Sequence, residues 1–172
     1  MRPIYFLLFM LLSCTKESSN GESLIAFGPE QSVTISGWSA DAMEPFLSAD
    51  GEHLFFNNLN DGINTQLFYA NRVDDAHFVW VGALSGANQP DSPRLDAVAD
   101  MDAQNNFYWT STRDYPAELN NLFRGDFTSG NILNAARVQG DFNKNTPGWL
   151  VMDHGISRDG QYLYYNNARF DD

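Results

Sequence analysis

The residues that could do chemistry in this chain are scattered carboxylates and three histidines. Asp153 directly precedes His154, and an acid beside a histidine can orient the imidazole as a general base. A lone pair of this kind is more often structural, and the spacing of His53, His77 and His154 fits no metal site. The chain also lacks a Gly-x-Ser-x-Gly elbow, a phosphate-binding glycine loop and a nucleophilic cysteine. The sequence therefore predicts no catalytic residue, no metal and no cofactor.

Oxygen-bearing side chains cluster in the segment Asn60-Asp61-Gly62-Ile63-Asn64. Such oxygens suit Ca²⁺, but the segment lacks the 12-residue loop with a terminal glutamate that is typical of a calcium-binding hand. Asn, Asp and Gly are also the residues that favour tight turns, because they tolerate positive φ and bond their own backbone. We therefore interpret the segment as a turn.

Two further carboxylates, Asp50 and Asp159, lie in a pattern that occurs twice. EPFLSADGEHLFFNN begins at Glu44 and SRDGQYLYYNN begins at Ser157, and a degraded copy, MDAQNNFYWTS, begins at Met101. In each full copy an Asp-Gly bend separates apolar, aromatic segments, which indicates a β-hairpin. Because these aspartates recur with the turn, their presence is explained by the formation of the turn and needs no catalytic role. The residues interpreted as structural turn residues are Ser48, Asp50, Gly51, Asp102, Ser157, Asp159 and Gly160.

Tryptophans are the candidates for ligand contact, because an indole presents a large apolar face with one polar N–H. Trp80 and Trp109 lie within strand patterns and are expected in the core. Trp38 and Trp149 each follow a glycine, which places them on or near loops, where binding residues concentrate. The longer turn RDYPAEL begins at Arg113 and could lie beside them. We predict a ligand-facing rim of Trp38, Arg113 and Trp149.

The N-terminus carries a targeting pattern. A basic lead, Met1-Arg2-Pro3, precedes an apolar run from Ile4 to Leu12. At ~1.5 Å per residue this run covers about half of a ~30 Å hydrocarbon layer, so it is too short to span a membrane and indicates a signal peptide. Its ending, Leu11-Leu12-Ser13-Cys14, resembles the lipobox of bacterial lipoproteins.

This resemblance implies that residues 1–13 are removed and that Cys14 receives acyl chains. Two or more acyl chains anchor a protein stably at a membrane. Residues 14–23 are polar and rich in Ser, as expected of a flexible tether. Thr15 stands where an aspartate would favour retention in the inner membrane. We therefore expect a lipid-anchored protein of the bacterial envelope, at the outer membrane, facing the periplasm or the cell surface.

The composition limits the remaining classes of partner. The chain has 172 residues, with 22 acidic against 10 basic side chains and a formal charge of −12. This charge repels a polyanion at long range, so a nucleic-acid partner is disfavoured. Aromatic residues make up 14% of the chain, which is high for a disordered protein. The length predicts one folded domain.

The elements that must position these residues are short strands separated by turns. A leading strand is predicted at residues 33–35. One group of four strands is predicted at 44–47, 53–57, 66–72 and 78–84, and a second begins near 92 and continues at 107–110, 121–124 and 136–138. A third group begins near 147 and includes the segment after Ser157. Phe55-Phe56 aligns with Tyr108-Trp109, so the groups repeat at about 50 residues, which points to repeated β units.

From Glu44 to Phe170 the pattern resembles the TolB-type β-propeller repeat: Glu44-Pro45, then Ser-Ala-Asp-Gly from Ser48, then an aromatic strand. The resemblance implies an all-β fold, a partial propeller of about two and a half to three four-stranded antiparallel blades. The domain covers residues 24–172, with blades at about 44–88, 92–139 and 147–172. The leading strand would complete the last blade. An open ring leaves strand edges exposed, so we expect the sequence to be a fragment of a longer propeller.

Two functions are compatible with these features. The first is a non-catalytic envelope lipoprotein that binds a protein or a glycan on its propeller. The alternative is a glycan-processing enzyme, because five-bladed propellers host glycosidases, which need two carboxylates about 5 to 10 Å apart across a pocket. The acids available outside the repeated turns are Asp96, Asp100, Glu118 and Asp153. Convergence of two of them would favour the enzyme.

Overall fold

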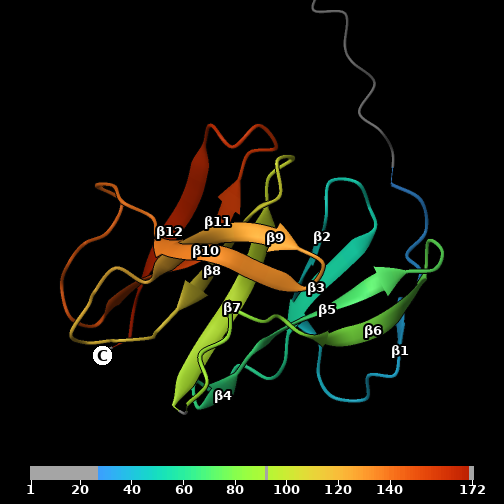
Figure 1. Ribbon diagram of the computed structural model, residues 1–172, viewed down its shortest axis with the longest axis horizontal. Coiled ribbons are helices and arrows are strands. Elements are labelled where there is room, and N and C mark those ends of the chain that lie inside the picture. Colours follow the sequence, from blue (N-terminus) through green and yellow to red (C-terminus); the bar gives the residue numbers. More distant parts are fainter. Residues whose placement is uncertain (1–26, 92, 171–172) are drawn as a thin grey trace, which may run out of the picture. The chain divides into compact units, whose positions relative to one another are not determined.

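The computed structural model describes residues 27–91 and 93–170 (Figure 1). In this part of the chain the regular elements are β-strands, and no helix is present. The strands form two five-stranded sheets and one two-stranded hairpin, all within the unit that begins at Gln31. The predicted all-β class is confirmed. The predicted signal peptide, Cys14 and the tether lie outside the described residues.

The first sheet has the strand order β1-β6-β5-β3-β2. Four of its strands form an antiparallel meander, and β1 pairs in parallel with β6. The leading strand was expected to complete the last unit, and this expectation is wrong. Ile35 instead packs on the apolar cluster of the first sheet, which would otherwise face solvent. The strands are β1 (Thr34–Ser36), β2 (Met43–Leu47), β3 (His53–Asn57), β5 (Leu67–Arg72) and β6 (His77–Ala83).

The second sheet has the order β10-β9-β8-β7-β4, with a second antiparallel meander and a short parallel strand, β4, paired with β7. The remaining hairpin joins β11 and β12 in antiparallel fashion. The strands are β4 (Asn64–Thr65), β7 (Arg94–Met101), β8 (Asn106–Ser111), β9 (Leu122–Thr128), β10 (Asn131–Arg137), β11 (Trp149–Ile156) and β12 (Leu163–Arg169).

The three hairpins β2–β3, β7–β8 and β11–β12 share one irregularity. In each, the ladder is interrupted by a bulge at the same distance from the turn. Each bulge holds a non-glycine residue at positive φ: Glu44 at 50°, Val98 at 57° and Asp153 at 42°. A bulge bends its strand and increases the local twist. The hairpins therefore repeat in structure as well as in sequence.

The first and third hairpins close through the same turn. Ser48 Oγ donates to Asp50 Oδ1 at 2.5 Å and accepts the backbone N–H five residues on at 2.9 Å. Ser157 Oγ donates to Asp159 Oδ1 at 2.6 Å and likewise accepts the N–H five residues on at 2.9 Å. The serine hydroxyl lowers the pKa of both aspartates, with help from a backbone N–H. Both carboxylates thus hold a turn together.

The second turn is one residue shorter and uses other side chains for the same bonds. Asp102 takes the place of the serine: its Oδ1 accepts the N–H of Gln104 at 2.9 Å and of Asn106 at 3.0 Å. Asn105, at φ 64°, takes the positive-φ place that Gly51 holds at 78° in the first turn. Asparagine is the best substitute for glycine in this conformation. This explains how the copy without a glycine still closes.

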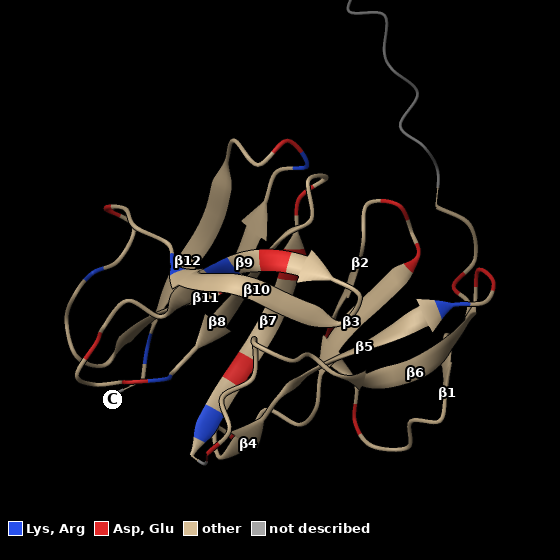
Figure 2. Cartoon of the chain, viewed as in Figure 1, with Lys and Arg blue, Asp and Glu red and all other residues tan. Residues whose placement is uncertain are grey.

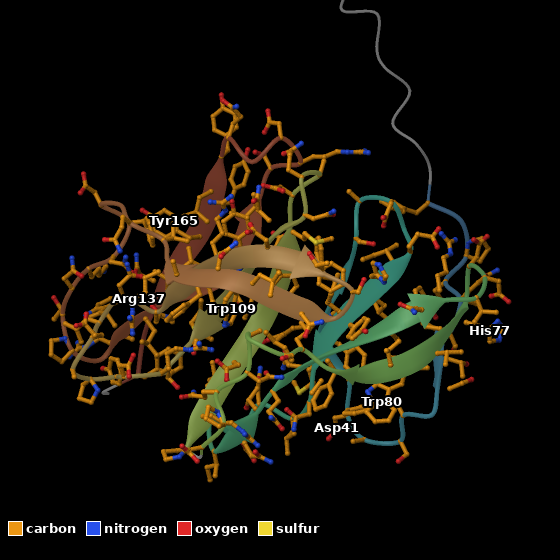
Figure 3. All side chains as sticks on the ribbon, in the orientation of Figure 1. Asp41, His77, Trp80, Trp109, Arg137 and Tyr165 are labelled. Atoms are coloured by element: carbon orange, nitrogen blue, oxygen red, sulfur yellow. The ribbon has the colours of Figure 1, made fainter. Side chains whose placement is uncertain are left out.

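The main core lies between the two large sheets. Phe55 of β3 and Phe107 of β8 are fully buried, with ring centroids 5.0 Å apart. Trp109 is also fully buried, as expected, whereas Trp80 is 37% exposed (Figure 3). Trp80 lies on β6, towards the outer edge of the first sheet, where Trp38 covers only part of its ring. Position across the sheet, and not strand pattern, decides which tryptophan is buried.

Candidate functional site

A pocket of about 340 Å³ opens at the end of the second sheet where β7 begins. A volume in this range suits a small ligand or a protruding side chain. Its wall combines the turn before β4, the start of β7, the loop after β8, the start of β11 and the residue that follows β12. The lining residues are Gly62, Pro93, Leu95, Thr112, Tyr115, Leu150 and Phe170.

The loop after β8 is held in place by Arg113. Its guanidinium lies over the ring of Phe123, 4.7 Å from the centroid, and its Nε donates to Ser111 Oγ at 2.9 Å. Its Nη2 lies 3.2 Å from Oδ1 of Asp96, a carboxylate with no exposed surface. Arg113 was predicted to face a ligand. The structure places its charged group on internal partners, so its role is to fix the loop beside the pocket.

Trp149 begins β11 next to the same pocket. The N–H of Gly148 donates to the hydroxyl oxygen of Tyr115 at 2.6 Å, which ties the loop after β8 to the start of β11. The ammonium of Lys144 lies 3.3 Å from the centroid of the Trp149 ring, and the ring is half-buried. The loop that begins at Arg113 and the start of the Trp149 strand are therefore brought together.

Trp38 is placed elsewhere. Its ring contacts Phe68, Phe56 and Trp80, with centroids 4.5, 5.2 and 5.8 Å away. Its Nε1 donates to the carbonyl of Asp41 at 3.2 Å. These contacts cover one face of the first sheet, and Trp38 does not line the pocket. Its role among the described residues is that of a partly buried packing residue.

The four acids named for a glycosidase do not surround the pocket. Asp100 is buried, and its oxygens accept the N–H of Met101 at 2.7 Å and of Ile156 at 2.6 Å. Burial raises its pKa, an effect that these two hydrogen bonds oppose. Glu118 and Asp153 are exposed, and Asn166 donates to Asp153 Oδ2 at 2.9 Å. With Asp96 paired to Arg113, none of the four lines the pocket.

The histidines lie apart from one another. His154, on β11, is buried, and burial lowers its pKa to about 4. Neither ring nitrogen makes a hydrogen bond of ordinary geometry with the described residues, although the backbone of Tyr108 lies close enough to oppose part of that shift. His53 pairs with Asn71 and His77 pairs with Asp74. Within the described residues no three side chains are grouped as metal ligands.

The Asn-rich segment before β4 forms the turn that the sequence predicts. Asp61 Oδ1 accepts the N–H of Ile63 at 2.9 Å and of Asn64 at 2.8 Å, and these bonds lower the pKa of its carboxyl. Gly62 adopts a φ of 67° between them. The acidic side chains as a whole are spread over several turns and strands (Figure 2).

The residues that sequence reasoning missed are the apolar ones of the pocket. Leu95 and Leu150 lie at the starts of β7 and β11, and each belongs to an ordinary strand pattern. Nothing in the local sequence distinguishes them from core leucines. Their grouping depends on how β7 and β11 meet, which is a long-range property. Tyr115 lay within the predicted turn that begins at Arg113, and that turn was the one usable signal.

No family model matches this chain, and no curated protein matches it. The described residues contain no helix that is long and apolar enough to cross a membrane.

Proposed function

We propose that this chain is a non-catalytic, lipid-anchored binding protein of the bacterial envelope, built on a TolB-type β-propeller. The repeated hairpins support the propeller, because the same bulge recurs in all three and the same serine-aspartate turn recurs in the first and the third. In the first two units the hairpin continues into a four-stranded antiparallel meander, β2-β3-β5-β6 and β7-β8-β9-β10, which is the form of a propeller blade.

The observation that favours binding over catalysis is that the buried candidate carboxylates have structural partners. Asp96 is paired with Arg113. Asp100 accepts the N–H of Met101 within β7 and the N–H of Ile156, and the second of these bonds joins β7 to β11. Glycosidases need two carboxylates that face one another across a substrate pocket. None of the four candidate acids lines the pocket beside β7. The arrangement supports a scaffold in which acids have structural roles.

The chemistry of the pocket favours an apolar group as its occupant. Leu95, Leu150 and Phe170 present carbon, and the hydroxyls of Thr112 and Tyr115 already accept backbone N–H groups. An apolar side chain of a protein partner loses no hydrogen bonds on entering such a site. A glycan would have to leave many of its hydroxyls without partners there. A protein partner is therefore preferred to a glycan.

The binding part of the proposal is tested by comparing binding with hydrolysis. The full chain is titrated with fragments of envelope glycans and with apolar peptides by calorimetry, and the same glycans are assayed for new reducing ends. We expect saturable binding of an apolar peptide and no glycan cleavage. Leu150→Asp should weaken the peptide binding, and Leu133→Asp, on the exposed surface of β10, should leave it unchanged. Cleavage that Asp96→Asn or Asp153→Asn abolishes would establish the enzyme instead.

The anchor is tested separately. Cells that express the chain are fed a labelled fatty acid and then fractionated. We expect label on the wild-type chain in the outer-membrane fraction, and neither label nor membrane association for Cys14→Ser. An unlabelled wild-type chain in the soluble fraction would refute the anchor without touching the binding claim.

A further inference from the structure

The outer edge of β12 differs from the corresponding edges of the other two hairpins. β3 is paired on that side by β5, and β8 is paired by β9, whereas no described strand pairs with β12 there. Its aromatic side chains are correspondingly exposed: Tyr164 is 66% exposed and Tyr165 is 45% exposed. The residues that correspond to Tyr164 are Phe55 and Tyr108, which are 0% and 8% exposed, and those that correspond to Tyr165 are Phe56 and Trp109, which are both 0% exposed. An unpaired edge with exposed aromatic residues is a template for another strand.

The correspondence between the edges follows from the ladders. The first residue pair after the turn is Leu47 with Leu54 in the first hairpin and Ile156 with Leu163 in the third. Counting from this pair, Tyr165 corresponds to Phe56 and Trp109, and Asn166 corresponds to Asn57 and Thr110. This alignment is fixed by hydrogen-bonded register and not by sequence similarity alone.

The strands that cover the first two edges carry one sequence pattern. β5 and the residue before it read Gln-Leu-Phe-Tyr-Ala-Asn from Gln66, and β9 with the residue before it reads Asn-Leu-Phe-Arg-Gly-Asp from Asn121. Both strands also bind in one register. The leucine lies opposite Asn57 in the first sheet and opposite Thr110 in the second. The phenylalanine lies opposite Phe56 and Trp109.

Two positions of the pattern have a physical reason in the packing of the strands. The leucines, Leu67 and Leu122, have no exposed surface. The small residue is Ala70 in one strand, fully buried, and Gly125 in the other, where a Cβ would collide with the side chain of Ile132. Large residues are excluded at this position because the fourth strand approaches closely.

The backbone of β12 presents the matching groups. In the first sheet the N–H of Asn58 donates to the carbonyl oxygen of Gln66 at 3.2 Å, and in the second the N–H of Ser111 donates to the carbonyl oxygen of Asn121 at 2.8 Å. These positions therefore bond the segments that lead into β5 and β9. The corresponding residue of β12 is Asn167. Because backbone groups alternate along a strand, the N–H groups of Leu163, Tyr165 and Asn167 point to the outer edge. Phe142 contacts the ring of Tyr165, with centroids 5.8 Å apart, and supports one face of the strand.

We infer that the outer edge of β12 binds an extended antiparallel strand of the pattern (Gln or Asn)-Leu-Phe-x-(Ala or Gly)-(Asn or Asp), with its leucine opposite Asn166 and its phenylalanine opposite Tyr165. Backbone hydrogen bonds supply the affinity in strand addition, and side-chain positions supply the specificity. This site is distinct from the pocket beside β7, so the inference stands independently of the proposed function.

The test uses the 172-residue chain in detergent and a fluorescent peptide with the sequence of residues 66–72, QLFYANR. A scrambled peptide of the same composition, LYQFNAR, is the control. We expect QLFYANR to bind at least about tenfold more tightly, as two matched cross-strand pairs provide, and to protect the amides of Leu163, Tyr165 and Asn167 from hydrogen exchange. Equal binding of both peptides, or protection at other strands, would overturn the inference.

A variant adds a second readout. Tyr165→Pro removes one outward N–H and leaves the hydrogen bonds between β12 and β11 in place, because a proline is tolerated on an edge strand. We expect it to lose peptide binding while its melting curve stays cooperative. If it does not fold, the exchange data on the wild-type chain still decide. Amides of β12 that are already protected in the peptide-free chain, together with concentration-dependent dimerisation, would assign the edge to a second copy and refute the inference.

Discussion

Replacing His154 tests whether hairpin β11–β12 is packed on the second sheet as described. His154 is buried on β11 with a pKa lowered to about 4 by that burial, against 6.5 in an unfolded chain. Between these values the unfolded chain binds a proton on this residue and the folded protein does not. The contribution of the buried neutral ring to the free energy of unfolding is therefore fully present above pH 6.5, and it is lost as the pH falls towards 4.

The magnitude follows from the two pKa values. Each tenfold difference in proton affinity is worth about 1.4 kcal/mol, so the folded protein loses about 3 kcal/mol on this account when the pH has fallen below 4. Between pH 7.5 and 5.0 the loss amounts to about 2 kcal/mol.

The assay is urea unfolding of the wild-type chain and of His154→Phe at several pH values, followed by fluorescence. Phenylalanine fills a similar volume and does not titrate, so the difference in the free energy of unfolding between the two proteins should change by about 2 kcal/mol in favour of the variant from pH 7.5 to 5.0. A difference that stays constant with pH would mean that His154 is solvated and that β11 does not pack as described.

The remaining predictions concern the loop anchor and the repeated turn. Arg113→Met leaves the buried carboxylate of Asp96 without its cation and should lower the free energy of unfolding by about 3 to 5 kcal/mol in urea. Arg124→Met, at an exposed arginine, should lower it by less than about 1 kcal/mol. Similar losses for the two variants would refute the role of Arg113 in holding the loop. Gly160→Ala forces a Cβ into a φ of 71° and to 2.8 Å from a neighbouring carboxylate oxygen, and should lower stability by about 1 to 2 kcal/mol. Gly82→Ala, which meets no atom within 4 Å, should cost nothing comparable, and equal melting temperatures for the two variants would contradict the turn geometry.

Local chemistry made the hairpins predictable. The strand predicted at residues 53–57 coincides with β3, and the strand at 107–110 lies inside β8. Both follow a turn with Asp and Gly or Asn and contain aromatic residues on a short run, which are the strongest local signals for a strand. The same signals led to the repeated turn residues, whose hydrogen bonds the structure displays.

Signals were weak where a strand is exposed or where its partner is distant. β10 begins at Asn131, five residues before the predicted start at Ala136, because most of its side chains are exposed and show no apolar alternation. The partner of β1 depended on the uncovered apolar face of the first sheet, which no local pattern reveals. Trp38 follows a glycine, as a loop residue does, and no local pattern reveals that its ring packs against Phe68.

The pocket includes one residue that the sequence could indicate and others that it could not. The turn that begins at Arg113 was identified from its length and composition, and Tyr115 of that turn lines the pocket. Leu95 and Leu150 could not be identified, because a leucine at the start of a strand looks the same in a core and in a binding site. Only the meeting of β7 and β11 separates the two.

The central claim, that one bulged hairpin occurs three times and is stacked in successive layers, is tested most directly by nuclear Overhauser contacts in the full chain. We expect contacts between the rings of Phe55 and Phe107, whose centroids are 5.0 Å apart, and between Thr110 and Val151, whose Oγ1 and carbonyl oxygen are 3.2 Å apart. We also expect positive φ at Glu44, Val98 and Asp153 from scalar couplings. Absence of both inter-layer contacts, or ordinary extended φ values at these three residues, would contradict the account.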